Sequence, residues 1–472
     1  MIRATLGIWI NYATTFAFQI IFAARYGSSA AANAFVITSG LLFGLSAVAT
    51  TSIQSVLVPR LVDPTGQLSG KALRTMIVLT AAAGLVLATI AALPNASARL
   101  LAHHVHLGIS DLAEPLRIAC LFTFLQVIAG VLIVIAIARG RRFMPAVAPA
   151  FPSIAACVLL ALQPRTSLPS LFGALAAGSA LEIAMLGLTF GRLQISRRMD
   201  ASLGFLTLAT AAQLSLLTLI PPVERVLASL HSPQGAAHYN YAIRSLAIVA
   251  QLLIGGVILS VLGDWSTLGE THAVRKVRQS LASVSVWCGV FFVFAASLAL
   301  VAGHALVRLV YEHGSFSRAD SHAVTRLLLL GLPGFCAEGP ILVLSQGLLA
   351  SRRNWPAIII GLAYGTLRLG LVFAFAARAG VDGVAIGYSL STVSILVVEI
   401  VVVARLGLLG RESVLALRAG AVIACGTLGG AGICVALDGV IPVVAQLVTV
   451  VGVFAVLIAI SRPQVEWRAR NA

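Results

Sequence analysis

Residues 114–138 read EPLRIACLFTFLQVIAGVLIVIAIA, and Glu114 and Arg117 are the only charged residues in this run. A helix of about 20 mostly apolar residues spans the hydrocarbon core of a bilayer. Comparable runs recur along the whole sequence, and no long polar segment remains between them. The sequence therefore predicts an all-α polytopic membrane protein. We expect about fourteen transmembrane helices, at residues 6–26, 33–58, 72–93, 114–138, 144–163, 168–191, 203–223, 238–263, 280–302, 322–350, 356–377, 383–404, 414–436 and 440–461.

The composition excludes a soluble protein. Charged residues make up 10% of the chain and apolar residues 59%, with a mean hydropathy of +1.00. Soluble domains carry about 25% charged residues. A chain so poor in charge could not cover its own surface in water, so lipid must cover it.

The basic residues set the expected topology. The net charge is +16. If the N-terminus is cytoplasmic, most lysines and arginines fall in the segments expected inside, as the positive-inside rule requires. We therefore expect a multi-pass protein of the bacterial inner (cytoplasmic) membrane with both termini cytoplasmic. The basic excess then reflects topology, and we expect no nucleic-acid partner.

An internal repeat indicates the domain organisation. Residues 140–145 (GRRFMP) resemble 351–356 (SRRNWP), and residues 173–181 (GALAAGSAL) resemble 383–390 (GVAIGYSL) at nearly the same separation. Such a repeat holds six helices, so both copies enter the membrane in the same sense. We expect a six-helix lobe at 1–200, a second at 201–410, and helices 13 and 14 with a cytoplasmic tail at 411–472.

Several motifs carry a resemblance to a known family. Residues 224–229 (ERVLAS) are similar to its "DRxLAS", 239–244 (YNYAIR) to its "xNYADR", and 309–316 (LVYEHGSF) to its "LLFERGAF". Residues 58–61 (VPRL) match the end of its second helix. The chain thus resembles the MviN/MurJ-like lipid II flippases of the multidrug/oligosaccharidyl-lipid/polysaccharide exporter superfamily.

The resemblance implies transport of a polyprenyl-diphosphate-linked saccharide, with lipid II of peptidoglycan biosynthesis as the first candidate. It implies movement from the cytoplasmic to the periplasmic leaflet by alternating access of the two lobes. Membrane lipids are the other expected partners. In the family the last two helices form a groove for the prenyl tail, so helices 13 and 14 are expected to do so here.

The sequence departs from the family pattern where the family binds the diphosphate. An Arg–Asp pair of helix 1 is replaced by Phe18 and Gln19, an arginine of helix 2 by Gly40, and the Asp of "YADR" by Ile243. Arg244 is retained.

Three arginines are the candidate substrate-binding residues. The planar guanidinium of Arg244 suits a diphosphate, and an interhelical salt bridge is the alternative. Arg25 could replace the missing helix 1 arginine, or simply face lipid headgroups at a helix end. Arg368, in the middle of a predicted helix, needs an anionic ligand or an acidic partner. Glu224 and Glu338 are its candidate partners.

Arg368 could also supply the positive charge that a coupling cation supplies in relatives. Glu182 and Glu399 are candidates for proton coupling, with buried structural acids as the alternative. The coupling ion, if there is one, is expected to be sodium or a proton. No metal site and no cofactor are expected, because the six cysteines lie in apolar runs and the His103, His104 and His106 cluster has no further ligand.

Competing functions remain within transport and outside it. An exopolysaccharide or O-antigen repeat-unit flippase fits the lost arginines, and a multidrug or cation antiporter of the same superfamily needs no basic cavity. The signature loop of major-facilitator carriers is absent from residues 59–74, so a carrier of that class is not favoured. An enzyme such as a membrane glycosyl- or acyltransferase would need a polar catalytic loop, and none is evident. A transporter, not an enzyme, is therefore predicted.

Overall fold

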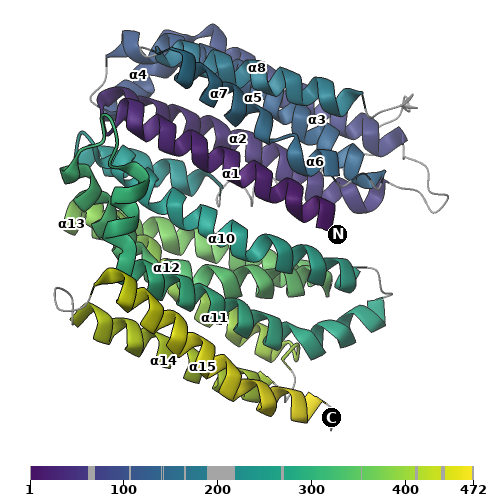
Figure 1. Ribbon diagram of the computed structural model, residues 1–472. Coiled ribbons are helices and arrows are strands. Elements are labelled where there is room, and N and C mark those ends of the chain that lie inside the picture. Colours follow the sequence, from purple (N-terminus) through teal and green to yellow (C-terminus); the bar gives the residue numbers. More distant parts are fainter. Residues whose placement is uncertain are drawn as a thin grey trace. The chain divides into compact units, whose positions relative to one another are not determined.

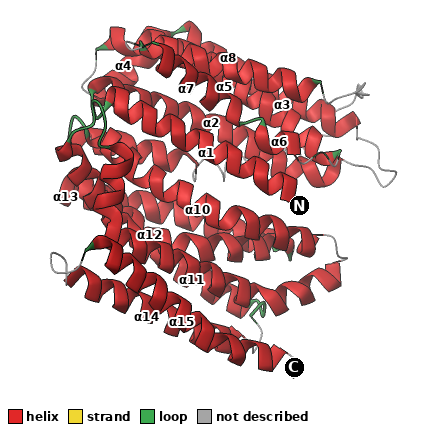
Figure 2. Ribbon diagram, viewed as in Figure 1, coloured by secondary structure: helices red, strands yellow, loops and turns green. Residues whose placement is uncertain are grey.

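A computed structural model describes the chain except residues 1, 62–69, 106–107, 140, 142, 164–165, 189–217, 267–269, 352, 410–412, 437–441 and 470–472. The residues that it describes form helices and no strands (Figure 1, Figure 2). The predicted all-α membrane architecture of about fourteen helices is therefore confirmed.

The N-terminal half contains eight labelled helices (Figure 1). They are α1 (Ile2–Tyr26), α2 (Ala30–Leu61), α3 (Gly70–Ala92), α4 (Pro94–Val105), α5 (Ile109–Ala138), α6 (Phe143–Val147), α7 (Ala150–Leu162) and α8 (Leu168–Gly187). Residues 218–231 are also helical. The rest of the helix predicted at 203–223 lies outside the described residues.

The C-terminal half contains six labelled helices. They are α10 (Gly235–Ser266), α11 (Glu270–Tyr311), α12 (Arg318–Ala350), α13 (Asn354–Arg405), α14 (Ser413–Ala436) and α15 (Val443–Ala469). Across the described residues, eight helices are long and apolar enough to cross a membrane, and three shorter apolar helices accompany them.

The backbone departs from helical geometry between α6 and α7 and at Gly380. The helix predicted at 144–163 is interrupted, because α6 ends at Val147 and α7 begins only after Pro149. The helices predicted at 356–377 and 383–404 are joined in α13, but Gly380 (φ 60°, ψ −134°) has a non-helical backbone there. A Cβ at Gly383 would lie 2.0 Å from the Phe375 carbonyl oxygen, so the two halves of α13 come into backbone contact after this break.

The chain forms two compact units, each with its own contacts. The first comprises Met1–Asn240 and Tyr311–Asp320, and the second Tyr241–Val310 and Ser321–Ala472. The predicted lobe boundaries at 200 and 410 stay predictions.

Aromatic and apolar side chains hold the first unit together. The Phe35 ring lies 4.6 Å from that of Phe22 and 5.1 Å from that of Phe172, so α1, α2 and α8 meet in one core. Helix α5 packs against α2, α3, α4 and α8, and α7 packs against α1 and α8. Close van der Waals packing of this kind favours association of helices in a membrane.

The second unit contains the last two helices. Helices α14 and α15 pack side by side (Figure 1). Phe294 of α11 stacks on Phe454 of α15 with ring centroids 4.0 Å apart, and Val290 and Ile423 complete this cluster. The pair α14–α15 is therefore anchored on α11.

Candidate functional site

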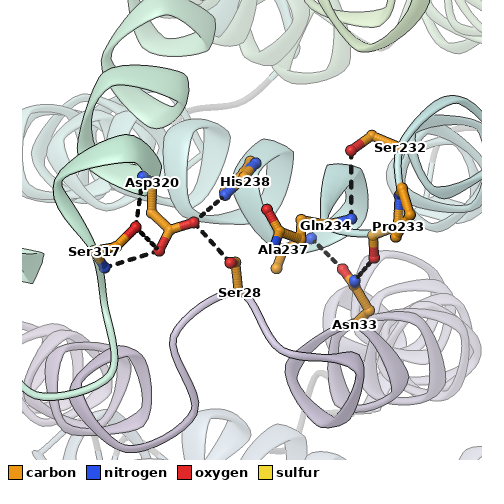
Figure 3. Close-up of polar contacts among 9 residues, drawn as sticks. All are labelled: Ser28, Asn33, Ser232, Pro233, Gln234, Ala237, His238, Ser317 and Asp320. Carbon is orange, nitrogen blue, oxygen red and sulfur yellow. Dashed lines mark hydrogen bonds and ion pairs between the residues drawn. The ribbon is translucent and has the colours of Figure 1, made fainter.

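A buried His–Asp pair forms the centre of a polar cluster in the first unit (Figure 3). The Asp320 carboxylate oxygen Oδ1 lies 2.7 Å from His238 Nε2 and accepts a hydrogen bond of 2.7 Å from Ser28 Oγ. Asp320 is 5% exposed and His238 9% exposed. A buried carboxylate is costly unless it is paired and hydrogen-bonded, and here both conditions hold.

The start of α12 positions this carboxylate. Ser317 precedes the helix and Asp320 lies in its first turn. Asp320 Oδ2 accepts hydrogen bonds from the Ser317 backbone N–H (2.8 Å) and Oγ (2.7 Å), and the Asp320 N–H donates to Ser317 Oγ (3.2 Å). This is a capping box with aspartate as the acid, so local sequence fixes the side chain that His238 and Ser28 contact.

Asn33 makes a second connection beside the first (Figure 3). Its side-chain amide donates to the Pro233 carbonyl oxygen, and its Oδ1 accepts a 2.7 Å hydrogen bond from the Ala237 N–H. Asn33 is 2% exposed. The start of α2 is thereby tied to the segment that begins α10.

Two glycines allow a third connection between backbones. Gly27 (φ 54°) and Gly314 (φ 62°) both have left-handed conformations. A Cβ would lie 2.4 Å from the Ser315 carbonyl oxygen at Gly27, and 2.2 Å from the Ala24 carbonyl oxygen at Gly314. The Ser315 N–H donates to the Ala24 carbonyl oxygen over 2.8 Å. Only glycine fits at either position.

These contacts join three segments that are far apart in the sequence, residues 24–33, 233–238 and 314–320, which we call the polar seam. Hydrogen bonds and close glycine–backbone contacts hold these segments together within the first unit. His238 and Asp320 were not predicted as site residues. The S-x-x-D pattern at 317–320, next to the family-like "YEHGSF" at 311–316, is the signal that could have identified Asp320.

Arg368 belongs to a polar cluster in the second unit. It is 8% exposed and donates from Nη1 to the Tyr364 hydroxyl over 2.9 Å. Its guanidinium carbon lies 4.7 Å from the centroid of the Tyr388 ring. The Tyr388 hydroxyl in turn donates to Glu338 Oε1 over 2.8 Å. Of the two expected partners, Glu338 thus shares a cluster with Arg368.

Glu224 is held elsewhere. It is fully buried in the first unit, and its Oε2 accepts a 2.9 Å hydrogen bond from the Tyr239 hydroxyl. Arg244 is exposed on α10, and Arg25 is exposed in the last turn of α1. The substrate-binding roles of Arg25, Arg244 and Arg368 stay predictions.

Glu182 and Glu399 are both buried carboxyls with neutral partners. Glu182 Oε2 accepts from Gln126 Nε2 over 2.9 Å, and Glu399 Oε1 accepts from Ser345 Oγ over 2.6 Å. The other oxygen of each carboxyl has no hydrogen-bond partner among the described residues. An unpaired, buried carboxyl is a group that can carry a proton, so the predicted coupling role stays open for both.

Arg225 was not predicted as a site residue, although it is the arginine of the motif at 224–229 (ERVLAS). Its Nη1 would lie 2.2 Å from a Cβ placed on Gly40, in the apolar helix α2. The guanidinium of Arg225 therefore occupies the space beside Gly40, a position where the resemblance leads one to expect an arginine.

An apolar cavity of about 380 Å³ lies within the second unit. Its walls come from α11, α12, α13 and α14, and include Val286, Pro333, Leu396 and Ala421. Such a cavity suits an apolar chain rather than a charged group.

Comparisons with known proteins agree with this architecture. A comparison with curated proteins found no match. Among solved structures, the chain is similar to the lipid II flippase MurJ in an inward closed conformation, with a TM-score of 0.78, 16% identity, and coverage of 98% of this chain and 100% of that one.

More distant structures share the fold. The MATE multidrug transporter DinF-BH gives a TM-score of 0.66 at 15% identity, covering 86% of this chain and 94% of that one. A MOP superfamily transporter from Pyrococcus furiosus, with a binding pocket described as of reverse polarity, gives 0.64 at 12% identity, covering 86% and 94%.

The family model "Lipid II flippase MurJ" matches residues 22–454. That match runs from the end of α1 into α15, and it includes the polar seam, the Arg368 cluster and the apolar cavity. The chain belongs to the MurJ family of lipid II flippases.

Proposed function

We propose that this chain moves an undecaprenyl-diphosphate-linked saccharide, with lipid II as the first candidate, from the cytoplasmic to the periplasmic leaflet by alternating access. The polar seam is the observation that carries the proposal. A carrier of this kind closes one side of its substrate path while the other opens. The seam gathers three segments expected at the periplasmic side, and its contacts are polar and breakable. It is the periplasmic gate in its closed state.

Guanidinium groups bind the diphosphate in this proposal. Arg244 matches the retained arginine of the family motif, and Arg225 takes the place beside Gly40 where the family pattern has an arginine on helix 2. Arginine binds phosphate oxygens through two parallel hydrogen bonds, which lysine cannot do. The guanidinium of Arg225 thus substitutes for one lost from α2. Arg25, in the last turn of α1, is the third candidate.

The prenyl tail stays in an apolar environment. The 380 Å³ cavity among α11, α12, α13 and α14 provides one within the second unit. Helices α14 and α15, packed on α11, extend that apolar surface. The saccharide can then cross in a polar path while the tail remains outside it.

Arg368 supplies a fixed positive charge in the second unit. Its guanidinium is shared between two tyrosines and linked through Tyr388 to Glu338. A bound sodium ion at this place would be repelled by a permanent cation. Coupling therefore comes from protons, with Glu182 and Glu399 as carriers, or from the membrane potential.

A second candidate function is an exopolysaccharide or O-antigen repeat-unit flippase. Phe18, Gln19 and Ile243 replace residues that the family pattern places near the headgroup. Gln19 is 6% exposed, and neither atom of its amide has a hydrogen-bond partner among the described residues. A different sugar could satisfy that amide, so this function stays the main alternative.

Depletion of a host's own lipid II flippase tests the proposal. We expect the wild-type chain to restore growth, Arg244→Ala to fail at normal membrane abundance, and Arg244→Lys to restore growth poorly. Arg326→Ala is the matched control, because this exposed arginine is paired with Asp382 in the second unit. Failure of the wild type, combined with accumulation of a different lipid-linked saccharide in the native host, would favour the second candidate.

A further inference from the structure

The first unit carries a groove that has no part in the proposed function. It runs between α3 and α5, encloses about 740 Å³, and is lined by Ala81, Gly84, Ala88, Leu121 and Phe124. A Cβ on Gly84 would lie 2.4 Å from Cε2 of Phe124, so this ring packs directly over the α3 backbone and forms the floor. Leu85 and Leu121 are 71% and 54% exposed, as expected of a surface that faces acyl chains.

One end of the groove is charged. Glu114 and Arg117 line it, both exposed and three residues apart on α5, so they share one helical face. The apolar span of α5 begins at Leu112. At a rise of 1.5 Å per residue, both side chains begin within about 8 Å of the end of the span. Long charged side chains at this depth reach the headgroup layer.

The two charges are not neutralised by each other. Neither Glu114 nor Arg117 forms an ion pair or a hydrogen bond with another residue in the part of the chain that the structure describes. Arg326 and Asp382, by contrast, form a closed surface pair on the second unit. The groove therefore offers one anionic and one cationic group to a molecule from the membrane.

We propose that this groove is a binding site for phosphatidylethanolamine. Arg117 binds the phosphate, Glu114 accepts hydrogen bonds from the primary ammonium, and an acyl chain lies on Phe124 between α3 and α5. Charge complementarity selects this lipid. Phosphatidylglycerol offers no cation to Glu114, and its net negative charge is repelled by that carboxylate. The quaternary ammonium of phosphatidylcholine has no N–H to donate.

Native mass spectrometry of the delipidated protein in detergent tests the site, since it does not depend on transport. Phosphatidylethanolamine, phosphatidylglycerol and phosphatidylcholine with identical acyl chains are titrated separately. We expect phosphatidylethanolamine to bind about tenfold more tightly than either other lipid, the effect of one charge-assisted contact. Glu114→Gln should remove its advantage over phosphatidylcholine, and Arg117→Gln should weaken both. Ala88→Phe, which fills the groove, should weaken all three.

Arg326→Gln is the matched control and should leave the preference unchanged. Equal affinity for the three lipids in the wild type would overturn the proposal. A preference for phosphatidylglycerol, or a phosphatidylethanolamine preference that survives both Glu114→Gln and Arg117→Gln, would overturn it as well.

Discussion

Asp320 shows how a single residue can join distant parts of this chain. Its capping role at the start of α12 fixes its position, and that position brings Ser28 and His238 within hydrogen-bonding distance. Removing one partner of a buried, hydrogen-bonded charge leaves the other unsatisfied and costs about 1–3 kcal/mol. A shift of that size changes the balance between closed and open states by one or two orders of magnitude.

Asp320→Asn should therefore open the seam. We expect a cysteine at Ala237, which is fully buried in the closed seam, to react with a membrane-impermeant maleimide about tenfold faster in the Asp320→Asn background. Asp382→Asn, which breaks only a surface pair, is the control and should not change the rate. Equal labelling in all three backgrounds would show that the His238–Asp320 contact does not hold the gate.

Gly314 provides a test of the backbone contact. Gly314→Ala combines the strain of a left-handed alanine with a clash against the Ala24 carbonyl, and we expect a loss of about 2–4 kcal/mol of stability. Gly407 has the same kind of backbone (φ 68°) but open space around it, so Gly407→Ala should cost about 1 kcal/mol. Thermal unfolding in detergent compares the two. Similar losses would mean that the close approach in the seam contributes nothing.

At the scale of elements, apolar runs predicted most helices because lipid imposes one rule on every spanning segment. Run length did predict separate helices at 356–377 and 383–404, on either side of the non-helical Gly380, but it could not show that Pro149 breaks the segment 144–163. It could not show the seam either. Asn33, His238 and Asp320 are ordinary residues in the sequence, and only the fold brings them together.

Charged residues in the middle of predicted membrane helices could be chosen as candidates from the sequence, because a charge inside the bilayer is costly and rare. Glu224 and Glu338 were both candidate partners of Arg368. Glu338 lies in its cluster through Tyr388, whereas Glu224 is hydrogen-bonded to Tyr239. Arg225 was missed because its meaning depends on Gly40, a contact between α2 and the helix at 218–231 that no local pattern reveals.

The Arg225–Gly40 contact makes its own prediction at this scale. Gly40→Ala should displace the guanidinium and reduce transport at least tenfold, the effect of losing one charge-assisted hydrogen bond. Gly173→Ala is the control, since nothing lies near that helical glycine, and it should transport normally. The double change Gly40→Arg with Arg225→Ala should recover part of the activity by returning a guanidinium to the same place. Full activity of Gly40→Ala would exclude a role for this contact.

Arg368 tests the proposed absence of a sodium site. Arg368→Ala removes a fixed positive charge from the cluster that contains Tyr388 and Glu338, so the carboxylate there should gain a cation or a proton. Flux in everted vesicles should then gain a sodium dependence or change its pH dependence relative to wild type, whereas Arg368→Ala combined with Glu338→Gln should show neither change. The same ion dependence in wild type and Arg368→Ala would give Arg368 a purely structural role.

At the scale of the whole molecule, family membership makes this chain a multi-pass transporter of the inner membrane that belongs to peptidoglycan synthesis, and not an enzyme. A lipid-linked saccharide and membrane lipids are the partners that the family implies. Composition alone established the membrane environment, and the motifs at 224–229, 239–244 and 309–316 indicated the family. The proposed direction of movement rests on the family resemblance, and the proposed orientation of the termini rests on the positive-inside rule.

In the proposed transport cycle, the polar seam must open for a lipid-linked saccharide to cross. Ser28→Cys with Asp320→Cys places two thiols where the wild-type side chains are in contact. The protein is reconstituted with lipid II in proteoliposomes, and crossing is followed by a reagent that reaches only the outer leaflet. We predict transport in the reduced protein, none after the disulfide forms, and recovery on reduction, with Ser28→Cys alone active throughout. Undiminished transport by the oxidised double variant would show that the polar seam does not need to open.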